Sequence, residues 1–234
     1  MSLSQELSGK ANKVIVGLNF TLVLGPYGIG LAHTPERNSS GCRSLPSPGF
    51  YQGEYLAQLG ILALKSKNIF ERAIGFAAIN AHYNRYDLEG SEGNGLDALM
   101  NQEVNTVVVG RFPSNKRLDS RISIIERTPI EGEYPESHAE ELLCNAEQVL
   151  ITASTLANGT LNNFLSFIPK SASTILLGPS APLSPKLFEY GLTEISGVCA
   201  KNESEAEKLA KVVAEGGSIR EMKHHRRLVT LKSI

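Results

Sequence analysis

Cysteine is scarce in the sequence, and this scarcity limits the kind of protein it can be. The three cysteines, Cys42, Cys144 and Cys199, lie far apart along the 234 residues. An odd and sparse count argues against a disulfide framework and for a reducing compartment. No CxxC, HExxH or other paired metal-ligand spacing occurs. We therefore predict a cytoplasmic protein that lacks the common metal-binding motifs.

Long apolar runs and an excess of one sign of charge are also missing. The first ten residues, MSLSQELSGK, lack an apolar signal core, and no apolar run reaches the roughly 18 residues that span a bilayer. The formal net charge is −1, and no basic stripe is interleaved with aromatic residues. We therefore expect neither a membrane nor a nucleic-acid partner. A P-loop and a GxSxG nucleophile elbow are absent too.

The apolar residues follow two different patterns along the chain. Residues 13–34 contain short alternating apolar runs, which is typical of two or three antiparallel strands. Apolar residues at helical spacing follow over 53–66 and 69–81. A polar, glycine-rich stretch at 84–95 is typical of a linker between domains.

Beyond this stretch, short apolar runs alternate with helix candidates. The runs are 105–110, 121–126, 148–152, 173–178, 194–199 and 227–231, and the helix candidates are 137–146, 160–168, 184–191 and 204–217. Such alternation, with strands that are apolar on both faces, indicates a parallel α/β sheet covered by helices. We therefore predict an α+β domain over 1–97 and a Rossmann-like α/β domain over 98–234.

Ligands of open α/β sheets bind outside the carboxyl ends of the strands. Four consecutive predicted strands end in small, glycine- or proline-shaped, or polar groups. They are Gly110, Arg111 and Phe112 after the first, Glu126 at the second, TASTLANGT (152–160) at the third, and Gly178, Pro179 and Ser180 after the fourth. We expect these groups to line a ligand site.

Glu126 carries the most specific chemistry among them. An acid that ends the second strand of such a unit often binds a ribose hydroxyl, so an enzyme with a nucleotide-like ligand is one hypothesis. The turn that follows the first strand, GRFPS, does not match the dinucleotide-binding pattern GxGxxG. The alternative is a solvated loop acid that pairs with Arg111 or Arg127.

TASTLANGT concentrates hydroxyl and amide groups where a strand is expected to pass into a helix. A helix cap requires one of these residues, whereas the stretch contains Thr152, Ser154, Thr155, Asn158 and Thr160, with Gly159 between the last two. We expect helix N-terminal amides and hydroxyls to form a pocket for an anionic group, opposite Gly178–Pro182. The alternatives are simple capping and, in the second segment, prolines that begin a helix.

Histidines offer the remaining candidates for metal or proton chemistry. His33 and His82 follow β and α segments of the N-terminal half and could face a cleft between the domains. Cys42 could join His33 in a soft-metal site, whereas a lone histidine is more often a surface residue or a satisfied hydrogen-bonding group. Cys144 and Cys199 lie on apolar faces and are expected in the core. No nucleophile–base pair stands out, so the residues leave the reaction open.

Several segments together resemble a family named for heavy-metal chelation, whose function is unknown. The resemblance rests on AEQVLITASTLANGTLNNFL (146–165), STILLGPSAPLSPKLFEYGLTEISG (173–197), VVVGRFP, the acid of IIERTP, EGEYPESHAEELL and the N-terminal GIGLAHT and ERAIGFAAINA. It covers about residues 13–231. It implies an enolase N-terminal-like domain followed by a Rossmann-like domain, with the site between them.

The resemblance also implies a ligand class and a set of positions. Family members are linked by genomic setting to heavy-metal chelation and to anaerobic cobalamin synthesis, which implies a divalent transition metal or a metal chelate as ligand. Departures from the family pattern are Ala153, where a glycine is expected, and Arg111, where a histidine is common. A homodimer is the expectation from base rates. The matching positions are Asn80, Gly110, Phe112, Pro113, Glu126, Tyr134, Pro135, Thr152, Thr155, Asn158, Gly159, Thr160, Gly178, Pro179, Ser180 and Pro182.

Overall fold

A small antiparallel sheet is the first structural unit of the chain. The computed structural model describes residues 3–4, 6–36, 44–93, 95–100, 104–112 and 121–233. Strands β1 (Lys13–Val16), β2 (Phe20–Leu24) and β3 (Ile29–His33) pair in the order β1-β2-β3, and both pairings are antiparallel. The predicted two or three antiparallel strands within residues 13–34 are therefore confirmed.

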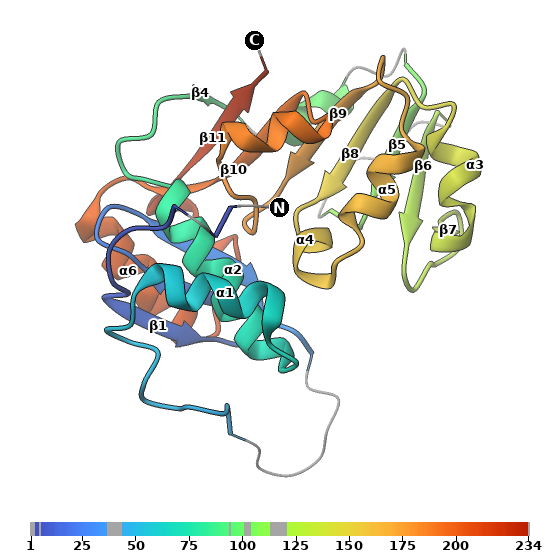
Figure 1. The fold of residues 1–234 in the computed structure, drawn as a ribbon. Coiled ribbons are helices and arrows are strands. Elements are labelled where there is room, and N and C mark those ends of the chain that lie inside the picture. Colours follow the sequence, from blue (N-terminus) through green and yellow to red (C-terminus); the bar gives the residue numbers. More distant parts are fainter. Residues whose placement is uncertain are drawn as a thin grey trace.

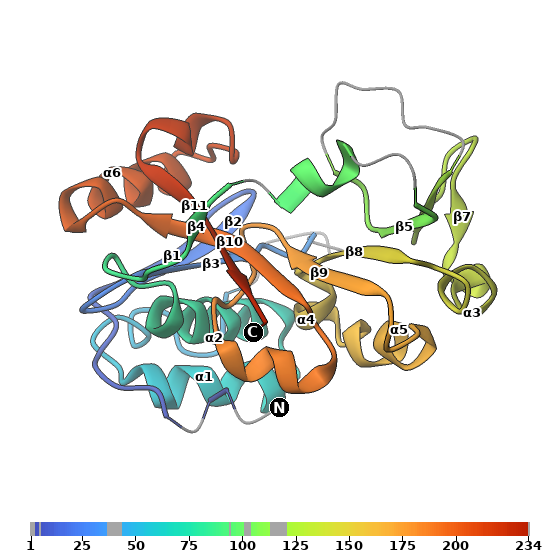
Figure 2. The same cartoon turned by 90° about the horizontal axis from the view of Figure 1, so that it is seen from above.

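Helices cover both faces of this small sheet. On one face lie α1 (Leu56–Lys65) and α2 (Ile69–Tyr83), and on the other lies α6 (Glu203–Ala214) (Figure 2). The alternation of side chains along a strand explains this, because Leu22 and Leu24 of β2 belong to the apolar cluster of α6, whereas Val23 belongs to the cluster of α1 and α2. The C-terminal helix thus completes the N-terminal layer.

The second unit is an eight-stranded sheet of order β4-β11-β10-β9-β8-β5-β6-β7. Every neighbouring pair from β10 to β7 is parallel. The predicted fold class, α/β with a large and mostly parallel sheet, is confirmed. The strands are β4 (Ser91–Glu92), β5 (Thr106–Val109), β6 (Ile122–Glu126), β7 (Tyr134–Pro135), β8 (Gln148–Thr152), β9 (Ser173–Leu177), β10 (Glu194–Ala200) and β11 (Arg226–Lys232).

The sheet is not parallel throughout, contrary to the prediction for its last strand. β11 is antiparallel to β10, and β4 is antiparallel to β11. The reason lies in α6, which follows β10 and contacts β1 and β2 of the small sheet. The chain therefore stays at the carboxyl edge of the large sheet and re-enters it in the opposite direction.

Short helices connect the strands of the large sheet. One face carries α3 (Ala139–Leu143), α4 (Ser154–Asn158) and α5 (Leu161–Phe167) (Figure 2). The predicted helix at 184–191 is a 3₁₀ helix, η3 (Pro185–Tyr190). The other 3₁₀ helices are η1 (Gly95–Met100), η2 (Glu136–His138) and η4 (Glu221–His224). Over the residues that the structure describes, no helix combines the length and apolarity needed to cross a bilayer.

The two sheets share a core, and two buried asparagines join them. Asn80 on α2 donates its Nδ2 to the carbonyl oxygens of Leu31 (2.7 Å) and Ser180 (2.9 Å). Asn84, one turn further, donates to the carbonyl oxygens of Ala181 (3.0 Å) and Val198 (3.1 Å), and its Oδ1 accepts from the Leu183 N–H (2.8 Å). Because residues from both sides of position 97 share these bonds and a single apolar cluster, the two-domain division stays a prediction.

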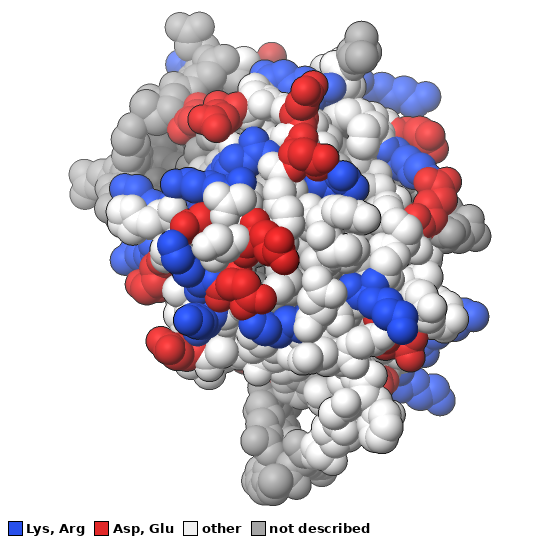
Figure 3. Space-filling model, turned by 90° about the vertical axis from the view of Figure 1, so that its left-hand side faces the viewer, with Lys and Arg blue, Asp and Glu red and all other residues white. Residues whose placement is uncertain are grey.

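The surface of the molecule carries mixed charge. On the face shown in Figure 3, the visible Lys and Arg side chains are interspersed with Asp and Glu side chains. Such a distribution does not create an extended field of one sign there.

Candidate functional site

The order of the strands defines a point where ligands of α/β proteins commonly bind. From β5 the chain goes first to β6 on one side and later to β8 on the other side. In open α/β sheets the crevice at such a topological switch point is the usual ligand site. Gly110 follows β5 and Thr152 ends β8, so these two residues flank the switch point. Figure 1 shows α4 at this end of β8, next to α1 and α2.

A cleft of about 710 Å³ lies at this edge of the large sheet. Its volume is typical of small-molecule sites, which occupy roughly 300–1,000 Å³. Eight residues predicted for the site line it together: His33, Gly110, Glu126, Thr152, Ser154, Thr155, Asn158 and Thr160. The lining also includes groups that sequence reasoning missed, namely Glu36, Arg72, Arg127, Thr128 and Glu136.

Gly110 allows the end of β5 to approach β8 closely. Its φ is +96°, a conformation that side chains other than glycine rarely adopt. A Cβ at this position would lie 2.5 Å from Cγ2 of Thr152. The backbone at the switch point and the Thr152 side chain are therefore in direct contact, which explains a glycine here without a GxGxxG motif.

Glu126 holds two strand ends together through backbone amides. Its Oε1 accepts the Arg111 N–H (2.9 Å) and its Oε2 accepts the Arg127 N–H (2.7 Å). The expected pairing with these two arginines thus involves their main chains. The Arg111 guanidinium instead binds Glu133 and holds the pKa of that carboxyl below its usual value.

TASTLANGT forms two helix segments separated by a glycine. The predicted helix at 160–168 is confirmed as α5, which begins at Leu161. The preceding helix α4 was not predicted, and it is terminated by Gly159, which has a φ of +81°. A left-handed glycine is a common helix terminator, and the NG pair was the signal for it. Asn158 Oδ1 accepts the N–H (3.0 Å) and the hydroxyl (2.7 Å) of Thr160, which precedes α5. Asn158 and Thr160 therefore stabilise the junction.

Hydroxyl groups at the start of this stretch are connected to one another. Thr152 Oγ1 lies 3.1 Å from Ser154 Oγ, and Thr155 Oγ1 donates to the Thr152 carbonyl oxygen at 2.7 Å. Each hydroxyl keeps further hydrogen-bonding capacity, since it has one donor and two acceptor sites. The end of β8 therefore presents a small polar surface to the cleft.

The N-terminal half contributes His33 and Arg72 to the opposite wall. The backbone N–H of His33 donates to Ser180 Oγ (3.0 Å), so the end of β3 is fixed to the loop after β9. Arg72 donates from Nη2 to the Ala157 carbonyl oxygen at the end of α4 (2.7 Å). Ile69, Arg72 and Ala73 share one face of α2 at i, i+3 and i+4 spacing, and all three line the cleft.

The remaining predicted residues lie elsewhere among the described part of the chain. Asn80 is fully buried, and Ser180 belongs with Gly178 and Pro179 to the loop that Asn80 holds. Phe112 packs against the apolar cluster that contains Val108 and Leu150. Tyr134 lies on the edge strand β7, and its ring centroid is 5.8 Å from the ring centroid of His138 on η2. Cys199 is buried as expected, whereas Cys144, also expected in the core, is exposed. Cys42 and Pro113 fall outside the described residues.

The structure does not bring His82 to the cleft with His33. His82 lies nine residues beyond Ala73 on α2, which corresponds to about 14 Å along the helix axis. Its Nδ1 accepts the Ser8 N–H at 3.3 Å, and burial lowers its pKa. A joint role of these two histidines at one metal ion therefore has no geometric support.

Metal donors in the cleft are spread out. The described lining offers one imidazole, three carboxylates and several hydroxyls, but among the described residues no group of three or more His, Cys, Asp or Glu is arranged to hold an ion. The described lining alone therefore does not form a preformed site for a bare metal ion.

The fold and the cleft define a class of α/β proteins in which a small antiparallel layer adjoins the strand ends of a large, mostly parallel sheet. Residues 95–232, more than half of the chain, match the DUF364 family model, and residues 8–83 match the DUF4213 model. Both models carry the description "Putative heavy-metal chelation". The chain belongs to the DUF364 family.

Similar proteins share the fold over nearly the whole chain. A DUF364-family protein of unknown function from Desulfitobacterium hafniense DCB-2 is 27% identical with a TM-score of 0.81, over 99% of this chain and 96% of that one. One from Pyrococcus horikoshii is 21% identical with a TM-score of 0.76 at the same coverage. An uncharacterized protein of Methanocaldococcus jannaschii is 31% identical over 147 residues, 56% of this chain and 55% of that protein. The chain thus matches about half the length of this curated relative.

Proposed function

We propose that the cleft binds a metal as a chelate, that is, together with a small anionic molecule that supplies most of the metal ligands. The observation that carries this proposal is the joint lining of the cleft by hydroxyl and amide groups from β8 and α4 and by His33 and Arg72 from the N-terminal half. Guanidinium, imidazole and hydroxyl groups are suited to bind the carboxylates or phosphates of such a ligand.

The family description supports metal handling, and the scattered donors in the cleft favour a chelate over a bare ion. A bare transition-metal ion requires several protein ligands converging on one point. A chelate requires only one protein donor or none, and the rest of the site can recognise the ligand. Imidazole is a common ligand for such metals, so His33 is the residue that would contact the ion. Corrinoid precursors carry metal and carboxylates, which connects this proposal to cobalamin-type metallocofactor metabolism.

Equilibrium dialysis with Co²⁺, with citrate and with Co²⁺–citrate tests this proposal. We expect the chelate to be retained and each component alone to bind at least about tenfold more weakly, a difference of 1.4 kcal/mol. His33→Ala and Thr152→Val should weaken retention. His224→Ala is the matched control, because His224 is an exposed histidine on η4 outside the cleft. Equal retention of bare Co²⁺ and of the chelate would contradict the proposal.

A soft-metal site formed by His33 and Cys42 is a separate outcome of the same experiment. In that case bare Co²⁺, Ni²⁺, Zn²⁺ or Fe²⁺ would bind, and Cys42→Ser would abolish binding while Cys144→Ser, at an exposed cysteine, would not. Thiolate and imidazole ligands favour these ions.

An enzyme with a nucleotide-like ligand at the strand ends is the second candidate, and the position of Glu126 in the cleft favours it. Both oxygens of Glu126 already accept backbone N–H groups, although each carboxylate oxygen can accept a further bond. A thermal-shift series with NAD(P), S-adenosylmethionine and nucleotides tests it, because a ligand that binds the folded state raises the melting temperature. No shift at millimolar concentration would eliminate this candidate.

A further inference from the structure

Helix α4 separates the cleft from a second, smaller pocket. Ser154, Ala157 and Asn158 line the cleft, and their i, i+3, i+4 spacing places them on one side of the helix. Leu156 and the terminating Gly159 line the second pocket on the other side. Thr155 lines both. The five-residue helix is therefore a shared wall with a polar side and an apolar side.

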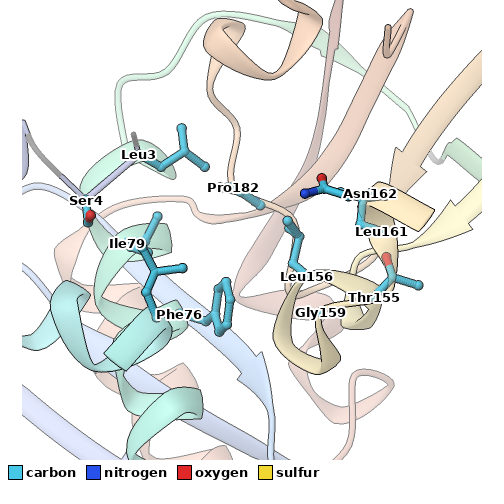
Figure 4. Close-up of a pocket in the computed structure, with 11 residues that line it drawn as sticks. Leu3, Ser4, Phe76, Ile79, Thr155, Leu156, Gly159, Leu161, Asn162 and Pro182 are labelled. Atoms are coloured by element: carbon cyan, nitrogen blue, oxygen red, sulfur yellow. The ribbon is translucent and has the colours of Figure 1, made fainter. Parts of the chain in front are cut away.

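The second pocket is mainly apolar and is assembled from distant parts of the chain. Its volume is about 160 Å³. Figure 4 shows Phe76 and Ile79 of α2 on one side and Leu156, Leu161 and Asn162 on the other, with Leu3 above Ile79 and Pro182 between the two sides. The complete lining is Leu3, Ser4, Leu64, Phe76, Ile79, Thr155, Leu156, Gly159, Leu161, Asn162 and Pro182.

The size and chemistry of this pocket define what it can hold. No ionisable side chain is among the described residues that line it, so it provides no partner for a charged ligand. Its volume is close to that of an engineered protein cavity of about 150 Å³ that binds benzene or xenon, although this pocket opens to the surface beside Leu64, which is 61% exposed. Its polar side chains are Ser4, Thr155 and Asn162, and because the Thr155 hydroxyl already donates to the Thr152 carbonyl oxygen, Ser4 and Asn162 are the ones that could bind one hydroxyl or amide of a ligand.

We propose that this pocket is a second ligand site, for a neutral, compact apolar molecule or substituent of about one ring. Its occupant would contact Leu156 and press on the helix whose opposite side lines the cleft. Arg72 holds the end of this helix through the Ala157 carbonyl oxygen, and Thr155 and Asn158 bind the residues before and after it, so α4 connects the two sites through several contacts. The site does not depend on what the cleft binds.

Xenon and benzene are the probes for this site. In xenon-pressurised crystals we expect a bound atom between Ile79 and Leu156. In ¹H–¹⁵N spectra, benzene should cause saturable shifts of the α4 amides, including those of the cleft-facing Ala157 and Asn158. Absence of xenon from the pocket, or shifts that do not saturate, would overturn the proposal.

A pair of filling variants makes the test specific. Ile79→Phe adds a ring to the pocket, whereas Val16→Phe adds the same ring at a position that is 39% exposed on β1, away from the pocket. Ile79→Phe should abolish the benzene shifts, and Val16→Phe should retain them. Because Ile79 is only 4% exposed, overpacking can prevent folding there. Leu64→Trp, at a lining residue that is 61% exposed, then serves as the blocking variant.

The outcomes of this test are independent of the cleft. Benzene shifts that persist in a folded blocking variant would show that benzene binds elsewhere, and the proposal would be wrong. Retention of Co²⁺–citrate is measured without benzene, so its failure would leave the second site intact. The two proposals therefore fail separately.

Discussion

The small sheet and the large sheet contact helix α2 in different ways. Against β3 the contact is mainly steric, because Gly30 lies so close to α2 that a Cβ there would be 1.8 Å from the Ala77 carbonyl oxygen, and one hydrogen bond, from Asn80 to the Leu31 carbonyl oxygen, accompanies it. Against the large sheet the contact is polar, because Asn80 and Asn84 bind backbone groups of the loop after β9 and of β10. Close apolar contact fixes a distance, whereas buried hydrogen bonds fix the exact register between the two layers.

The largest effect is expected on the steric side of this comparison. Gly30→Ala would force the new methyl group into the α2 backbone, and we expect a loss of about 3 kcal/mol or more in the free energy of unfolding. Gly93→Ala is the control, since no atom lies within 4 Å of a Cβ there. Urea unfolding of both variants measures the difference. Equal stability of the two would show that α2 can move away from β3 at little cost.

Loss of the polar contacts should lower the free energy of unfolding less, and Asn84 and Asn80 should contribute different amounts. Asn84→Ala leaves two carbonyl oxygens and one N–H without this partner, and we expect a loss of roughly 2–3 kcal/mol. Asn80→Ala removes two bonds to carbonyl oxygens, and its Oδ1 already has no partner among the described residues, so we expect roughly 1–2 kcal/mol. Chemical denaturation ranks the two variants, and the reverse order would contradict this account.

At the strand ends, Glu126→Gln tests the bond between β5 and β6. A carboxylate accepts at both oxygens, whereas an amide accepts at one, so one of the two backbone N–H bonds is lost. We expect a decrease of about 1 kcal/mol in unfolding free energy. Glu131→Gln is the control, because Glu131 is an exposed acid of the adjacent loop. A decrease as large as that of Asn84→Ala would place the register-determining contact at the strand ends instead.

The smallest expected effect is on the dependence of the unfolding free energy on pH. The Arg111 hydrogen bond lowers the pKa of Glu133, so the stabilisation is present above the unfolded-state pKa of Glu and is lost as pH falls through the lower folded-state pKa. Arg111→Ala should therefore reduce the dependence of unfolding free energy on pH in the acidic range. Titration of the unfolding midpoint from pH 6 down to the acid limit provides the measurement. An unchanged slope would show that this pair, in which the Glu133 side chain is 7% exposed, contributes nothing to the free energy of unfolding.

The strands and their polar ends could be predicted from the sequence because continuous apolar runs and their flanking residues are local signals. Thr152 ends β8, Ser154 and Asn158 lie in the short helix after it, and parallel strands end at one edge. Arg72 could not be predicted, because its role depends on how α2 meets α4. The antiparallel β11 was also out of reach, since it results from α6 packing on a sheet nearly 200 residues earlier in the sequence. His82 was predicted for the cleft but lies away from it, because its position in the sequence does not give its distance in space from His33.

The paired asparagines have a consequence for the rate of ligand binding. A site between two independently moving bodies opens and closes, and its observed binding rate levels off at the rate of that motion. Here Asn80 and Asn84 tie the layers on either side of the cleft through buried hydrogen bonds. Opening the cleft by a hinge would break several of these bonds at once. We therefore expect the cleft to be preformed, so that the observed association rate of the chelate proposed for it rises linearly with the concentration of that chelate.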